Sequence, residues 1–138
     1  MILADLTIEG KARKVIMQAP TNGFYYVLDR LTGELLSAEK FERATWAERI
    51  DLSTGRPVEA PGIRMKPGEQ KLIYPGPYGA HNWQAMSVDV EAGLVYLPAQ
   101  DNPLIYGMNE EWKQTGLYKR NPGGWNTGLE FGRIAQLF

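Results

Sequence analysis

One short turn motif, Asp-x-x-Thr/Ala-Gly, occurs three times and sets the main limit on how this chain can fold. The copies are DRLTG at 29–33, DLSTG at 51–55 and DVEAG at 89–93. In such a turn the aspartate accepts hydrogen bonds from backbone N–H groups two or three residues on, and the glycine takes the positive φ that closes a hairpin. A single copy is explained as an ordinary turn, but three copies favour a β-architecture built by repetition.

The apolar pattern between these turns is typical of β-strands. Alternation or short apolar runs are present in MILADLTI, KVIMQAP, GFYYVLDR, ELLSAEKF and GLVYLPAQ. Helical periodicity is weak and is confined to 39–49 and 110–117. Fifteen glycines and nine prolines divide the chain into short segments. We therefore predict an all-β fold and one domain over 1–138, with strands in 1–100 and an irregular covering tail over 101–138.

Composition excludes several classes of protein and site. The chain has 138 residues, 43% of them hydrophobic, which is enough for one domain with a core. Fifteen basic and sixteen acidic residues are interspersed, so we expect no nucleic-acid partner. The absence of cysteine excludes disulfides, thiolate metal sites and covalent c-type haem attachment. The first residues do not have the pattern of a signal peptide and no apolar run is long enough for a membrane span, so we expect a soluble chain of unknown compartment.

Five segments, in order along the chain, resemble the pyrroloquinoline-quinone (PQQ)-dependent alcohol dehydrogenases. They are 18–41, 45–62, 78–87, 93–100 and 123–131. The resemblance implies about two blades of an eight-bladed quinoprotein-type β-propeller. It also implies PQQ and calcium as the cofactors, oxidation of a primary alcohol to an aldehyde, and a periplasmic location. A subset of the family carries an added haem domain.

The resemblance also implies that most of the active site lies outside this chain. Family members are several times longer, and their calcium ligands, catalytic aspartate, adjacent-cysteine disulfide and tryptophan platform belong to stretches that would precede Met1. We therefore assign no catalytic and no metal-ligating residue. We expect a truncated oxidoreductase by descent that is inactive alone and does not by itself hold PQQ or calcium as the complete family members do.

One cofactor-binding position implied by the resemblance is Thr21, which follows the QAP sequence. Family members have lysine or arginine there, and its charge bonds the quinone oxygens. Threonine offers a single hydrogen bond and no positive charge. The loss of one preorganised donor is worth roughly 3–4 kcal/mol of barrier in comparable oxyanion sites. The alternative interpretation is that Thr21 is simply a turn residue of the sequence PTNG.

The other positions implied by the resemblance are Asn82 and Trp83, in the sequence His-Asn-Trp. In the family this run lies on the cofactor side of a blade. An asparagine amide can bond quinone or carboxylate oxygens, and an indole supplies an apolar wall with one N–H. The alternative is an aromatic core anchor beside a turn. His81 is a weak metal candidate, because a lone histidine without cysteine lacks partner ligands.

Two blades taken from a closed propeller would leave apolar blade faces uncovered, and our expectations about binding partners follow from this. We expect a homo-oligomer, most simply a twofold dimer, with no membrane partner and a small alcohol as substrate only if missing blades complete the site. A functional alternative is a stand-alone binding or scaffold module that recruits a partner through these faces. The tail aromatics either cover an apolar face or form an interaction surface: Trp112, Tyr118, Trp125 and Phe131.

Overall fold

A computed structural model of the chain describes residues 1–107. The chain divides into two compact units. The first comprises Met1–Ile63 and Ile73–Leu104, and the second comprises Arg64–Leu72 and the residues from Ile105 onward. The described part contains ten strands, and in it no helix is long and apolar enough to cross a membrane.

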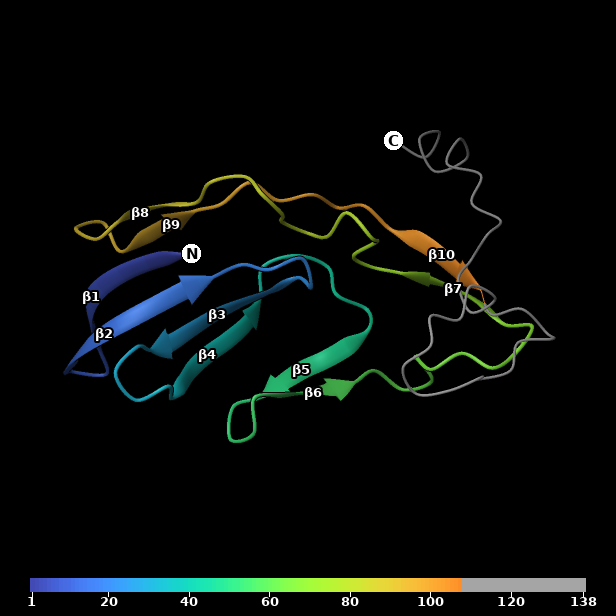
Figure 1. Cartoon of the computed structure of the whole chain (residues 1–138), viewed down its shortest axis with the longest axis horizontal. Coiled ribbons are helices and arrows are strands. Elements are labelled where there is room, and N and C mark those ends of the chain that lie inside the picture. Colours follow the sequence, from blue (N-terminus) through green and yellow to red (C-terminus); the bar gives the residue numbers. More distant parts are fainter. Residues whose placement is uncertain (108–138) are drawn as a thin grey trace, which may run out of the picture. The chain divides into compact units, whose positions relative to one another are not determined.

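The largest sheet of the first unit is a four-stranded antiparallel meander (Figure 1). Its strands lie in the order β1 (Ile2–Ile8), β2 (Lys11–Gln18), β3 (Phe24–Asp29) and β4 (Leu35–Lys40). Ala4 pairs with Val15 and Met17 pairs with Val27, so apolar residues face each other across the strands. This is the arrangement expected of one propeller blade.

The other strands form three two-stranded sheets. β5 (Ala47–Asp51) pairs with β6 (Arg56–Glu59), β8 (Ser87–Asp89) with β9 (Leu94–Tyr96), and β7 (Gln70–Ile73) with β10 (Leu104–Gly107). The weak helical pattern over 39–49 therefore does not produce a helix. β10 lies in the segment expected to be irregular, and 108–138, with the tail aromatics, is outside the described residues.

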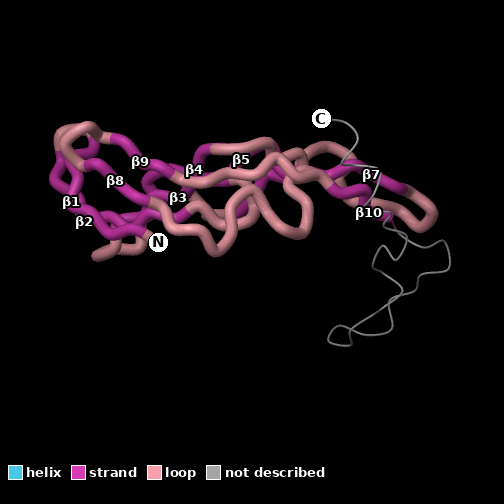
Figure 2. Tube along the Cα trace, turned by 90° about the horizontal axis from the view of Figure 1, so that it is seen from above, coloured by secondary structure: helices cyan, strands magenta, loops and turns pink. Residues whose placement is uncertain are grey.

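Both faces of the four-stranded sheet carry apolar clusters. On one face, buried Ala4, Val15 and Met17 contact Val88 and Val95 of the β8–β9 hairpin. Figures 1 and 2 show this hairpin beside β1 and β2. The second cluster is formed by Phe24, Ala38, Ala44, Ala47 and Ile50, where β3 and β4 meet β5. Successive strand residues point to opposite faces, so the period-2 pattern of the sequence supplies both clusters.

The three copies of the turn motif close the hairpins β3–β4, β5–β6 and β8–β9, as predicted. Their glycines, Gly33, Gly55 and Gly93, have φ values of 79°, 67° and 68°. The Oδ1 atom of Asp51 accepts from the Ser53 N–H at 2.8 Å, and that of Asp89 accepts from the Ala92 N–H at 2.9 Å. The aspartate and the glycine therefore have the roles that the sequence indicated.

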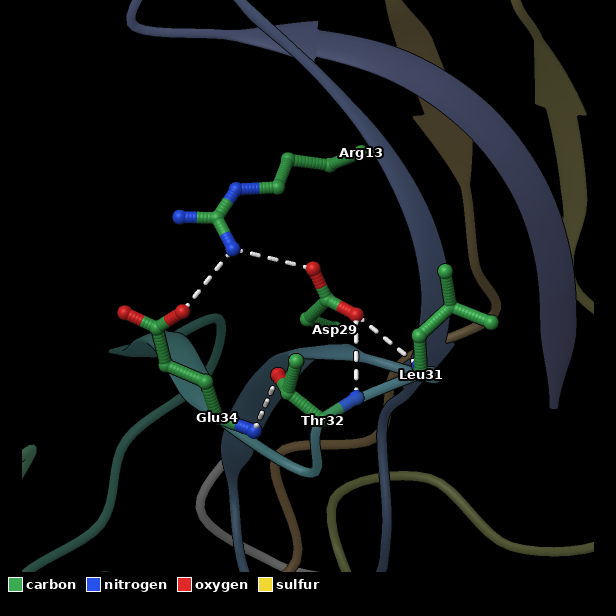
Figure 3. A network of polar contacts seen from close by, with 5 residues as sticks. All are labelled: Arg13, Asp29, Leu31, Thr32 and Glu34. Atoms are coloured by element: carbon green, nitrogen blue, oxygen red, sulfur yellow. Dashed lines mark hydrogen bonds and ion pairs between the residues drawn. The ribbon is translucent and has the colours of Figure 1, made fainter.

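The first copy is reinforced by an ion pair (Figure 3). Asp29 is buried, and its Oδ1 accepts from the N–H groups of Leu31 at 2.9 Å and Thr32 at 3.3 Å. Its Oδ2 accepts from the Arg13 guanidinium at 2.9 Å, and the same guanidinium nitrogen donates to Glu34 at 2.8 Å. Arg13 lies on β2, so the network fixes the β3–β4 turn against the neighbouring hairpin.

This network predicts a pH-dependent contribution to stability. The hydrogen bond from Arg13 and then that from the Leu31 N–H lower the pKa of Asp29 below its usual 3.8. A carboxylate with a lowered pKa stabilises the folded chain fully above its unfolded-state pKa and loses that contribution as the pH falls through the folded-state value. Asp29→Asn keeps an acceptor for the turn but loses the ion pair. We expect it to lower the urea midpoint at pH 7 and to reduce the loss of stability between about pH 5 and pH 2.

The matched control is Asp51→Asn in the equivalent β5–β6 turn, where the carboxylate has no comparable ion pair with arginine among the described contacts. It should change the urea midpoint less than Asp29→Asn. Equal effects of the two substitutions would contradict the importance assigned to Arg13.

Candidate functional site

The loop 79–83 carries the candidate site and is fixed by backbone hydrogen bonds to two other segments. The Ala80 N–H donates to the Thr21 carbonyl at 3.0 Å, and the Gln100 N–H donates to the Ala80 carbonyl at 2.8 Å. Thr21 lies in the β2–β3 connection, and Gln100 follows β9. All three segments belong to the first unit. The loop is therefore attached on both sides, and its residue Ala80, two positions before Asn82, bonds directly to Thr21.

Gly79 allows the close approach of the loop to Thr21. Its φ is +78°, and a Cβ atom placed on it would lie 2.5 Å from the Thr21 Cβ and 2.7 Å from the Thr21 Cα. Only glycine adopts this backbone conformation without a steric cost, and only a residue without a side chain fits against Thr21. The sequence signal was the run of glycine and proline before His81.

Thr21 itself lies in a well-supported turn, in agreement with its interpretation as a turn residue. The next residue, Asn22, accepts a hydrogen bond from the Phe24 N–H at 3.0 Å, and its amide donates to the Tyr26 hydroxyl at 2.8 Å. The Trp46 indole N–H donates to the Asn22 carbonyl at 2.9 Å. Thr21 is exposed, so a turn role and a contact with a ligand are compatible.

Trp83 is 85% exposed, so its interpretation as a core anchor is wrong. The buried member of the His-Asn-Trp run is His81, at 3% exposure. Asn82 is also exposed; its side-chain amide donates to the Tyr78 carbonyl at 3.2 Å, and its backbone N–H donates to Gln84 Oε1 at 3.3 Å. A tryptophan this exposed, beside an asparagine oriented by its own loop, is an arrangement typical of a ligand-contacting surface.

A hollow of about 290 Å³ lies beside this pair. It is lined by Met1, Gln18, Ala19, His81, Asn82, Trp83, Gln84, Ala85 and Met86. No aspartate, glutamate, lysine or arginine is among these residues, so the described wall offers amide groups, an indole, the imidazole of His81 and apolar surface. Sequence reasoning did not identify Gln18, Gln84 or Met86; the available signal was that Gln18 belongs to QAP and that Gln84 and Met86 follow His-Asn-Trp.

The described residues do not offer a set of metal ligands. Within 1–107, no group of three or more histidine, cysteine, aspartate or glutamate side chains is arranged to hold a metal ion. We therefore assign no metal chemistry to the described part of the site.

Comparison with known proteins shows the family to which this chain is related. The chain is 60% identical over 104 residues, 75% of its length, to quinohaemoprotein alcohol dehydrogenase ADH IIB of Pseudomonas putida, of which it covers 15%. It is 46% identical over 95% of its length to a quinohaemoprotein alcohol dehydrogenase of Comamonas testosteroni, of which it covers 19%. The chain is homologous to a segment of the quinohaemoprotein alcohol dehydrogenases.

Solved structures of quinohaemoprotein alcohol dehydrogenases have a fold similar to that of this chain. The crystal structure of the Comamonas testosteroni quinohaemoprotein alcohol dehydrogenase matches 91% of this chain with a TM-score of 0.73 and 45% identity, and the match covers 19% of that structure. ADHIIG of Pseudomonas putida HK5 matches 83% with a TM-score of 0.74 and 45% identity, over 17% of its length. The all-β, quinoprotein-propeller fold class is thereby confirmed. No protein-family model matches the chain. The chain spans less than a fifth of the length of these relatives.

The contact between Gly79 and Thr21 can be tested by substitution. Gly79→Ala places a methyl group against Thr21 and retains the unfavourable positive φ, so we expect a loss of unfolding free energy of about 2–4 kcal/mol. Gly33→Ala is the matched control, because Gly33 has a φ of +79° with no atom within 4 Å of its added Cβ. It should cost about 1–2 kcal/mol, the backbone contribution alone. Chemical denaturation of both variants measures the difference, and equal losses would show that Thr21 does not confine the loop.

Proposed function

We propose that this chain forms one wall of a quinone-binding site of the kind found in PQQ-dependent alcohol dehydrogenases. The observation that supports the proposal is the hydrogen bond between the Ala80 N–H and the Thr21 carbonyl, at 3.0 Å. It brings together two motifs, at positions 21 and 82–83, that are about sixty residues apart in the sequence. The sequence identity with quinohaemoprotein alcohol dehydrogenases provides independent support.

The residues present fit an edge of a quinone and do not fit calcium. Trp83 offers the face of an exposed indole, and Asn82 offers an amide that can bond quinone or carboxylate oxygens. Thr21 adds a hydroxyl without a positive charge. Since the described residues lack a group of carboxylate or histidine ligands, we derive no step through a metal ion.

The proposal assigns binding and orientation to this chain, and no proton transfer. When bound, PQQ is the acceptor for the electrons of the alcohol. The exposed amide of Asn82 and the indole of Trp83 would hold the edge of the quinone in a fixed plane. A threonine at position 21 would leave the reduced quinone's charge without a cationic partner on this wall. Oxidation of an alcohol is therefore proposed only for an assembly that supplies a general base and a metal site from other polypeptide.

Fluorescence titration with PQQ tests the proposed site. We expect quenching of the chain's tryptophan emission with a Kd of about 0.1–1 mM, because one wall provides only part of the contacts of a complete ligand site. Trp83→Phe should remove most of the quenching, and Asn82→Ala should weaken the binding by about tenfold, the value of one hydrogen bond to a charged group. Trp46→Phe is the matched control, because Trp46 packs against Phe24 in the second apolar cluster. Micromolar binding unaffected by either Trp83→Phe or Asn82→Ala would place the site elsewhere.

A second candidate function is a binding module that self-associates, and exposed apolar side chains favour it. On the β8–β9 hairpin, Val95 packs against the sheet, whereas Leu94 and Tyr96 are 50% and 56% exposed. On β1, Leu3 is 60% exposed. We propose that such surfaces associate in a twofold dimer, the most frequent closed symmetry.

Light scattering over a range of protein concentrations tests this second candidate. We expect a mass of roughly twice 15.5 kDa at micromolar concentration, and Tyr96→Lys should shift the population to monomer by placing a charge in the contact. A mass of 15.5 kDa at every concentration would contradict self-association.

A further inference from the structure

His81 is a buried polar side chain directly before the exposed pair of the candidate site. Its exposure is 3%, and its Nδ1 atom lies 2.7 Å from the carbonyl oxygen of Pro98. A carbonyl oxygen can only accept a hydrogen bond, so Nδ1 carries the hydrogen and donates it. The histidine is therefore held in one ring orientation and one tautomer.

The bond to Pro98 lies next to the two backbone bonds of Ala80. Ala80 has no exposed surface, and its carbonyl accepts from the Gln100 N–H at 2.8 Å. Residues 80 and 81 are thus attached to residues 100 and 98 of the segment that follows β9. Beyond residue 81 the loop is exposed at Asn82 and Trp83. His81 is the last buried attachment before the residues that would contact a ligand.

We propose that His81 is a positioning residue, which sets the orientation of Asn82 and Trp83 through the hydrogen bond from its Nδ1 to the Pro98 carbonyl. The inference deepens the proposed quinone wall and rests on it for its ligand. The orientation of the pair does not depend on a ligand, and so it can be measured in the free chain. The side chain at position 81 would act on binding through the orientation of Asn82 and Trp83.

Two substitutions separate the hydrogen bond from the volume of the side chain. His81→Asn keeps an N–H donor at the δ position, where the histidine has Nδ1, and so it should keep the attachment to Pro98. His81→Leu fills a comparable space and removes the donor. Since a net hydrogen bond changes an equilibrium by roughly 2- to 10-fold, we expect His81→Leu to raise the Kd for PQQ by that factor and His81→Asn to leave it near the wild-type value.

Fluorine NMR of the chain labelled with 5-fluorotryptophan measures the orientation in the absence of ligand. The Trp83 signal is assigned by its loss in Trp83→Phe, and Trp46, whose indole N–H donates to the Asn22 carbonyl at 2.9 Å, is the internal reference. We expect the Trp83 signal to shift or broaden in His81→Leu, with the Trp46 signal unchanged, and to return to its original position in His81→Asn.

The outcomes distinguish this inference from the proposed function. A Trp83 signal that depends on His81 in a chain that does not bind PQQ would support the positioning role and overturn the quinone wall. PQQ binding and a Trp83 signal that are both unchanged in His81→Leu would overturn the positioning role alone. If His81→Leu does not fold, His81→Gln is measured in its place. The amide donor of glutamine lies one bond further from the backbone than Nδ1, so it is misplaced for the hydrogen bond to the Pro98 carbonyl. An unchanged Trp83 signal in His81→Gln would likewise overturn the inference.

Discussion

Two backbone hydrogen bonds on Ala80 determine where the candidate site lies. One joins the 79–83 loop to Thr21 and the other joins it to Gln100, at 3.0 and 2.8 Å. Buried backbone groups must be paired, so a residue with no exposed surface that bonds two distant segments is difficult to displace. The absence of a side chain at Gly79 makes the approach possible. Asn82 and Trp83, which are exposed, follow directly on this attached segment of backbone.

The four-stranded sheet supports this arrangement because each of its two faces packs against other strands. The β8–β9 hairpin packs on one face, through Val88 and Val95, and its two ends continue into the 79–83 loop and the 98–100 segment. The opposite face contacts β5 through the cluster that includes Phe24 and Ile50. Thr21, in the β2–β3 connection of the same sheet, bonds the 79–83 loop. The site is therefore assembled where three loops meet at the ends of strands, a common position for binding residues on a rigid scaffold.

The sequence predicted the fold more fully than it predicted the site. The period-2 pattern and the Asp-x-x-Thr/Ala-Gly turns indicated β-hairpins, because both signals are local and depend on few neighbouring residues. The exposure of Trp83 was not predictable in this way. A tryptophan next to a turn is equally typical of a core and of a surface, and only the burial of His81 and Ala80 decides which side faces the solvent. The hydrogen bond between His81 and the Pro98 carbonyl joins residues seventeen positions apart, and no local sequence pattern predicts it.

The central claim, that positions 21, 82 and 83 form one quinone-binding wall, is tested most directly by mapping the contact on the folded chain. A titration of the ¹⁵N-labelled chain with PQQ, followed by amide and indole chemical shifts, locates it without substitution. The account predicts that the largest shifts occur at Thr21, Asn82 and the Trp83 indole, with small shifts around the Asp51 turn on β5–β6. Shifts concentrated on β5–β6, or absent from Asn82 and Trp83 at saturating quinone, would contradict it.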